Sequence, residues 1–226
     1  MFPDTTTGTD GRDASGLKQT RLAGGAFVVG AVLFLVGGAI TIEADPPPST
    51  APVLGMVSHA LWFFAITLLA LGAVTLLRWI EGLRTGLAGY LATGTLGLGV
   101  LLGLQWVAWA YVDVRASRYE EYELLVEPLM SSFGAGHLLM YAVLAGGGVG
   151  FLGWALVRTR LTHRFVAWAA VAIGTLTVLT ATVSLLAVLT GGGDGHVLFN
   201  TATLLLPVLY GWAMIFGVDV SRRTPS

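Results

Sequence analysis

Long apolar runs separated by shorter polar segments dominate the chain. Six such runs cover residues 22–42, 53–77, 86–112, 133–157, 165–189 and 196–218. Each is about 21 to 27 residues long, and a helix of that length crosses a hydrocarbon core of about 30 Å. The strict alternation that marks membrane β-strands is absent from these runs. Because lipid offers the backbone no hydrogen-bond partners, the pattern predicts an all-α fold, a bundle of six transmembrane helices.

The polar segments divide this predicted transmembrane domain, residues 22–218, into three hairpins: first helix with second, third with fourth, and fifth with sixth. Residues 1–21 are rich in Thr, Gly and Asp, which predicts a disordered tail. A short second tail is predicted over residues 219–226. The first apolar run is longer than the apolar region of a signal peptide and is followed by a poor cleavage site, so we expect an uncleaved anchor.

Composition supports the membrane assignment and excludes several kinds of chemistry. Hydrophobic residues make up 55% of the chain and charged residues 11%, whereas a soluble domain has about 25% charged residues. The net charge of −1 gives no reason to expect nucleic-acid binding. The chain has no cysteine, which excludes disulfides, thiolate metal sites and covalently attached haem. It also lacks a phosphate-binding loop with a Lys-Ser/Thr pair, so no ATP site is expected.

Basic residues are distributed unevenly between the two sets of connecting segments. With the N-terminus in the cytoplasm, the outer segments hold only Arg115 and Arg118. The inner segments then hold Arg12, Lys18, Arg21, Arg78, Arg84, Arg158, Arg160, Arg164, Arg222 and Arg223. Cytoplasmic segments of membrane proteins carry such an excess of Lys and Arg. The sequence therefore predicts a multi-pass protein of a prokaryotic plasma membrane, with both termini cytoplasmic.

Three of the four histidines occur in one short pattern: a small residue, histidine, an apolar residue and leucine. The pattern occupies residues 58–61, 136–139 and 195–198. Each copy lies early in the second helix of a predicted hairpin. This places His59 and His137 within the outer part of the bilayer and His196 nearer its surface.

An ionisable side chain inside a membrane span is costly and is a candidate for a functional site. Neutral imidazole binds transition metals and haem iron. We therefore predict that His59, His137 and His196 are ligands of haem or a transition metal in redox chemistry, with His59 and His137 as the principal pair. Polar groups at similar depth are Gln105, Tyr141 and Asn200, and candidate walls of the pocket are Trp62, Trp106, Trp109 and Tyr111. The alternative for each histidine is a structural hydrogen bond.

Two other functional classes stay open on the sequence. The chain is alternatively a non-catalytic accessory or assembly subunit that packs against a membrane-protein partner or a second copy. It is alternatively a carrier of a small solute or lipid, with glycine-rich helices as moving parts. Pairs of glycines four residues apart, Gly99 with Gly103 and Gly146 with Gly150, are expected to face other helices and let their backbones approach closely. No residue pattern assigns a reaction.

Overall fold

The computed structural model describes residues 10–43, 51–79, 86–116, 127–159, 161–190 and 195–222, with the side chains of most of them. Within these ranges the chain is all-helical, and six helices are long and apolar enough to cross a membrane. They are α1 (Asp10–Glu43), α2 (Ala51–Trp79), α4 (Leu87–Ala116), α6 (Glu127–Val157), α7 (Arg164–Thr190) and α8 (Gly195–Arg222). The predicted fold class is confirmed at this level.

The helices extend past several of the predicted spans. The first helix begins at Asp10, inside the segment predicted as a disordered tail, and residues 1–9 lie outside the described part of the chain. The fourth begins at Glu127 and the last continues to Arg222. An apolar run indicates which residues are suited to a lipid environment, and not where the helix begins or ends. Helix formation itself does not require apolar side chains, so a helix continues past the apolar boundary.

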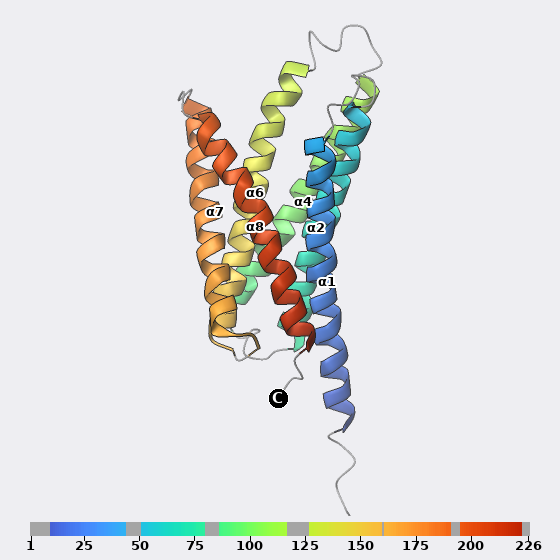
Figure 1. The fold of residues 1–226 in the computed structure, drawn as a ribbon, viewed down its shortest axis with the longest axis vertical. Helices are drawn as coiled ribbons and strands as arrows, with labels where there is room; N and C mark the ends of the chain where they lie inside the picture. Colours follow the sequence, from blue (N-terminus) through green and yellow to red (C-terminus); the bar gives the residue numbers. More distant parts are fainter. Residues whose placement is uncertain are drawn as a thin grey trace, which may run out of the picture.

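Each helix packs against its neighbour in sequence, and α8 returns to pack against α1 as well as α7. Figure 1 shows α8 crossing the bundle obliquely, with its upper end beside α7 and its lower end beside α1. A smaller contact joins α8 to α6. The helices therefore form a closed ring around a shared core, and residues far apart in sequence meet in it.

The core of the ring is apolar and aromatic. Its largest fully buried side chains include Tyr141, Tyr210, Phe27, Phe216 and Ile66. Many large apolar side chains on the outward faces stay exposed, among them Leu22, Leu98, Leu101, Leu179 and Leu204. Such a surface is unfavourable in water and is what a lipid environment requires.

Glycines allow α6 and α7 to pack with their backbones almost in contact. A Cβ added to Gly174 would lie 2.6 Å from the Cα of Gly150, and one added to Gly146 would lie 2.9 Å from the Cβ of Thr177. Gly99 faces Ile66 of α2, and Gly103 faces Phe63 of the same helix. The prediction that Gly99, Gly103, Gly146 and Gly150 face other helices is confirmed.

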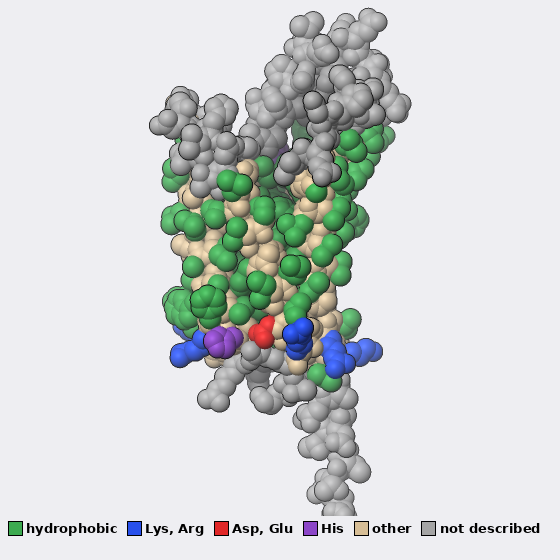
Figure 2. Space-filling view, in the orientation of Figure 1, with side chains coloured by type: hydrophobic (Ala, Val, Ile, Leu, Met, Phe, Trp, Pro, Cys, Tyr) green, Lys and Arg blue, Asp and Glu red, His purple; other side chains and the backbone are tan. Residues whose placement is uncertain are grey.

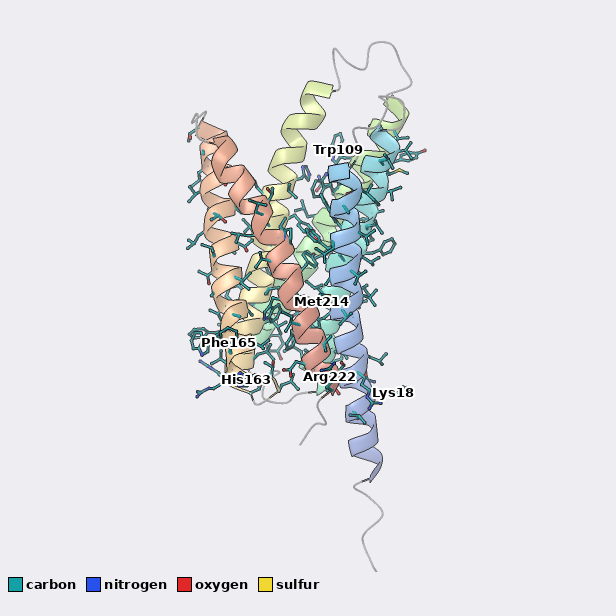
Figure 3. The ribbon with its side chains drawn as sticks, in the orientation of Figure 1. Lys18, Trp109, His163, Phe165, Met214 and Arg222 are labelled. Atoms are coloured by element: carbon teal, nitrogen blue, oxygen red, sulfur yellow. The ribbon has the colours of Figure 1, made fainter. Side chains whose placement is uncertain are left out.

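The described basic side chains gather at one end of the bundle, where α1 begins and α8 ends (Figure 2). We call this set the basic rim; it comprises Lys18, Arg21, Arg78, Arg158, Arg164 and Arg222. At the same end, Thr162 donates a hydrogen bond of 2.6 Å to Asp219 and so links the α6–α7 connection to α8. Figure 3 shows His163 at this end and Trp109 at the opposite one.

Candidate functional site

His59 lies near the start of α2, in the half of the bundle away from the basic rim, and its neighbours on α2 fix its direction. Ser58 is fully buried and donates a hydrogen bond of 2.8 Å to the carbonyl of Gly37 on α1. One turn later, the indole N–H of Trp62 donates to the carbonyl of Phe34 at 3.2 Å. Residues four apart share a helix face, so these two bonds hold that face of α2 against α1.

The imidazole of His59 is half-buried and packs against two aromatic rings. Its centroid lies 4.4 Å from that of Trp106 on α4, with the planes tilted by 31°. The ring of Trp62 meets it edge-on at 5.7 Å. Nδ1 of His59 is buried and finds no hydrogen-bond partner among the described residues. Leaving such an atom without a partner costs about 1–3 kcal/mol.

His137 on α6 approaches the same indole from a different helix. Its ring centroid lies 6.3 Å from that of Trp106, with the planes tilted by 33°. The distance between the two imidazole centroids is therefore at most the sum of their distances from the Trp106 centroid. The structure thus brings His59 and His137 to one tryptophan, which is itself 7% exposed.

The remaining histidines are placed differently. His196 belongs to α8, but its side chain lies outside the described residues, as does that of Asn200, so its role as a third ligand stays a prediction. His163 is exposed, and its Nδ1 accepts a hydrogen bond of 3.3 Å from the backbone N–H of Phe165. Among the described side chains there is no group of three His, Cys, Asp or Glu residues that would hold a metal ion.

Beside the histidines lies an aromatic cluster, which we define as Phe34, Trp62, Trp106, Tyr141 and Tyr210. Phe34 stacks on Tyr210 with centroids 3.9 Å apart and planes within 3°. It also stacks on Trp62 at 5.6 Å. Trp106 lies 6.3 Å from Tyr141, so the cluster is continuous with both imidazoles. Aromatic rings from α1, α2, α4, α6 and α8 therefore meet at one level of the bundle.

Two buried tyrosine hydroxyls hydrogen-bond to each other inside this cluster. Tyr141 and Tyr210 are both 0% exposed. The Tyr141 hydroxyl donates to the backbone carbonyl of Trp62 at 3.3 Å and also hydrogen-bonds to the Tyr210 hydroxyl. Since Tyr141 uses its single proton on the carbonyl, Tyr210 is the donor in the tyrosine pair. Both buried hydroxyls then have a hydrogen-bond partner.

The sequence identified part of this environment. Tyr141, Trp62 and Trp106 belong to it as expected, whereas Gln105, Trp109 and Tyr111 are exposed. Phe34 and Tyr210 were not anticipated. The one available signal was that Tyr210 is a polar residue deep in an apolar run, but its partner lies 69 positions away in the sequence.

No family model, curated protein or solved structure matches the chain. The case for a function therefore rests on its own residues: two imidazoles at one indole, a buried nitrogen without a described partner, and the aromatic rings beside them.

Proposed function

We propose that this protein is a multi-pass membrane protein that holds a transition metal ion or haem iron at His59 and His137 for redox chemistry. The observation that carries the proposal is the buried Nδ1 of His59, which has no hydrogen-bond partner among the described residues. A neutral imidazole nitrogen offers a lone pair, and coordination to a metal would use it.

The surroundings of His59 favour coordination over a structural hydrogen bond. Imidazole suits copper, zinc, iron and nickel, and it is a common axial ligand of haem iron. Trp106 and Trp62 cover the ring and limit the access of water, which competes for open coordination positions. His137 supplies a second imidazole at Trp106, and His196 is proposed as a third ligand from α8.

The basic rim supports a cytoplasmic placement of the end at which α1 begins and α8 ends. Cytoplasmic segments carry the excess of Lys and Arg in membrane proteins, and this set lies together in space as well as in the sequence pattern. Both termini are then cytoplasmic, the membrane is the plasma membrane of a prokaryote, and α1–α2, α4–α6 and α7–α8 are the three hairpins. On this topology the histidine site lies in the outer half of the bilayer.

Metal analysis and an absorption spectrum of the full chain, purified in mild detergent, test the site. We expect a bound transition metal or a haem spectrum, or saturable binding when the protein is titrated with Cu(II) or haem. His59→Phe keeps an aromatic ring beside Trp106 and removes the ligand nitrogen. Mutation of a residue that only orients a metal ligand typically lowers metal affinity about tenfold or more. His59→Phe removes a proposed ligand itself, so we expect it to lower metal affinity by at least about tenfold.

His163→Phe is the matched control, because His163 is exposed at the other end of the bundle. It should bind the metal or haem as the unmodified chain does. The proposal would be contradicted if His59→Phe bound metal or haem as tightly as the unmodified chain does. So would the absence of both metal and haem at isolation and after titration, and that result would favour the accessory-subunit alternative.

A further inference from the structure

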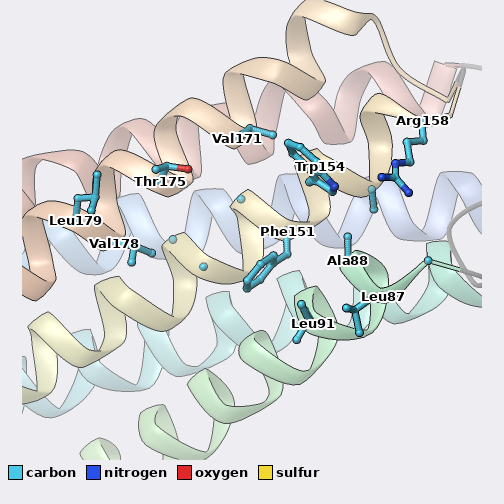
Figure 4. A pocket seen from close by; sticks show the side chains of 16 residues that line it. Leu87, Ala88, Leu91, Phe151, Trp154, Arg158, Val171, Thr175, Val178 and Leu179 are labelled. Carbon is cyan, nitrogen blue, oxygen red and sulfur yellow. The ribbon is translucent and has the colours of Figure 1, made fainter.

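A second feature of the molecule lies away from the histidines, on the outer face of the ring. A groove of about 780 Å³ runs between α4, α6 and α7. Its walls are mostly apolar and include Leu91, Phe151, Trp154, Val178 and Leu179. Figure 4 shows these side chains arranged along the groove, with Arg158 near one end.

The groove follows from the way α6 packs. Gly146 and Gly150 bring α6 close to α7, and together with Gly147 they line the groove without side chains. A Cβ added to Gly147 would reach 3.2 Å from Cγ2 of Thr95 and 3.9 Å from Cγ2 of Val178. A larger side chain at Gly147 would therefore project between the flanking helices and occupy part of the groove.

The length of the groove matches one leaflet of a membrane. Along α6 its lining runs from Gly146 to Arg158. At about 1.5 Å per residue this is about 18 Å, compared with about 15 Å for half of a 30 Å hydrocarbon core. A single extended acyl chain fits this length, whereas a compact apolar solute would leave most of it unfilled.

The charge at the end of the groove indicates what kind of headgroup it suits. Arg158 is exposed, lines the groove and belongs to the basic rim. Guanidinium binds phosphate through paired N–H donors, and a headgroup at this depth is where the phosphate of a phospholipid lies.

We propose that this groove is a binding site for an anionic phospholipid, with one acyl chain along Phe151, Trp154 and Leu179 and the phosphate headgroup at Arg158. The site lies in the leaflet on the side of the basic rim. It is separate from the histidine site, so either proposal can fail without the other.

Fluorescence quenching of the full chain in phosphatidylcholine vesicles tests this site, because Trp154 lines the groove. The vesicles carry either brominated phosphatidylglycerol or brominated phosphatidylcholine as the quencher. The emission due to Trp154 is obtained by difference from Trp154→Phe. We expect brominated phosphatidylglycerol to occupy the site about fivefold more readily, since one basic side chain near the surface contributes about 1 kcal/mol towards anionic lipid.

Two matched pairs of variants separate the groove from general lipid contact. Arg158→Gln should abolish the preference for phosphatidylglycerol, and Arg78→Gln should keep it, because Arg78 is exposed on the basic rim but does not line the groove. Gly147→Leu should fill the groove and reduce quenching of Trp154 by both lipids. Gly94→Leu should not, because a Cβ at Gly94 meets nothing within 4 Å.

Equal quenching by the two brominated lipids, or a preference that survives Arg158→Gln, would overturn the proposal. Quenching unaffected by Gly147→Leu would also overturn it, because the lipid would then be outside the groove. No quenching of Trp154 by either lipid would mean that protein, such as a second copy, covers this face, which is equally incompatible with the proposal.

Discussion

The paired hydroxyls of Tyr141 and Tyr210 show how polar atoms are accommodated in this core. Each tyrosine is fully buried, and the two form a short chain of hydrogen bonds that ends on the carbonyl of Trp62. A buried hydroxyl without a partner costs about 1–3 kcal/mol, whereas an apolar pair of the same shape is nearly neutral. The pair therefore specifies how α6 and α8 meet and contributes little net stability.

At this scale we predict a strongly non-additive double-mutant cycle. Tyr141→Phe removes the acceptor of Tyr210 and should destabilise the protein by about 1–3 kcal/mol. Tyr210→Phe leaves Tyr141 bonded to the Trp62 carbonyl, so its cost should be smaller. The double variant should be less destabilised than the sum of the single variants. Unfolding of the four proteins in mixed detergent measures the cycle, and additive free energies would show that the hydroxyls do not interact.

Among the helices, the contact between α6 and α7 is set by the absence of side chains. Gly174 approaches the backbone of α6 at both Gly146 and Gly150. Gly153 makes the same kind of contact one turn further along, where an added Cβ would lie 2.5 Å from the Cβ of Ala170. In lipid, helices associate through close packing, which small residues permit.

We predict opposite effects for two Gly→Ala substitutions at this scale. Gly174→Ala should separate α7 from α6 and destabilise the protein by about 1–3 kcal/mol, as overpacking does. Gly94 is exposed on α4 with open space around it, so Gly94→Ala should be neutral or stabilise the helix by up to about 1 kcal/mol. Thermal unfolding in detergent compares them. Equal melting temperatures for Gly174→Ala and Gly94→Ala would mean that α6 and α7 move apart without a loss of stability.

The described part of the molecule has a strong charge asymmetry along its long axis. The basic rim lies at the end where α1 begins and α8 ends, and the histidines and the aromatic cluster lie nearer the opposite end. This asymmetry is what orients membrane proteins during insertion. The proposed histidine site and the proposed lipid site would consequently lie in opposite leaflets.

At this scale we predict that both termini are cytoplasmic. The chain has no cysteine, so single cysteines can be introduced without background. Cysteine at Ser49 or Ser117 should react with a membrane-impermeant thiol reagent in intact cells, because these positions lie in the α1–α2 and α4–α6 connections. Cysteine at Thr85 or Ser226 should react only after the membrane is permeabilised. Labelling of Ser226→Cys in intact cells would contradict this topology.

The sequence was most informative about helix number and least informative about helix ends. Apolar length alone predicted six membrane-crossing helices, because the thickness of a bilayer sets that length. It did not predict that α1 begins at Asp10, because the first residues of this helix are mostly polar and give no apolar signal. It also predicted that the paired glycines would face other helices, since small residues gain nothing by facing lipid.

The candidate site was anticipated in part, and its assembly depends on tertiary structure. The repeated pattern identified His59 and His137, but nothing local indicates that Trp106 contacts both. Tyr210 reaches Tyr141 only because α8 returns across the ring to contact α6. The groove at Arg158 likewise requires α4, α6 and α7 together.

The sequence by itself determined the class of protein, the number of membrane-crossing helices and the uneven distribution of basic residues. These are local properties, because transfer into lipid depends on each segment's own length and polarity. Apart from the paired glycines, only the tertiary structure decided which face of each helix turns inward. Lipid and core are both apolar, so a helix that is apolar on all sides carries little information about its rotation. Here that rotation is fixed by specific contacts, such as Ser58 with Gly37 and Gly174 with Gly150, between helices that only the fold brings together.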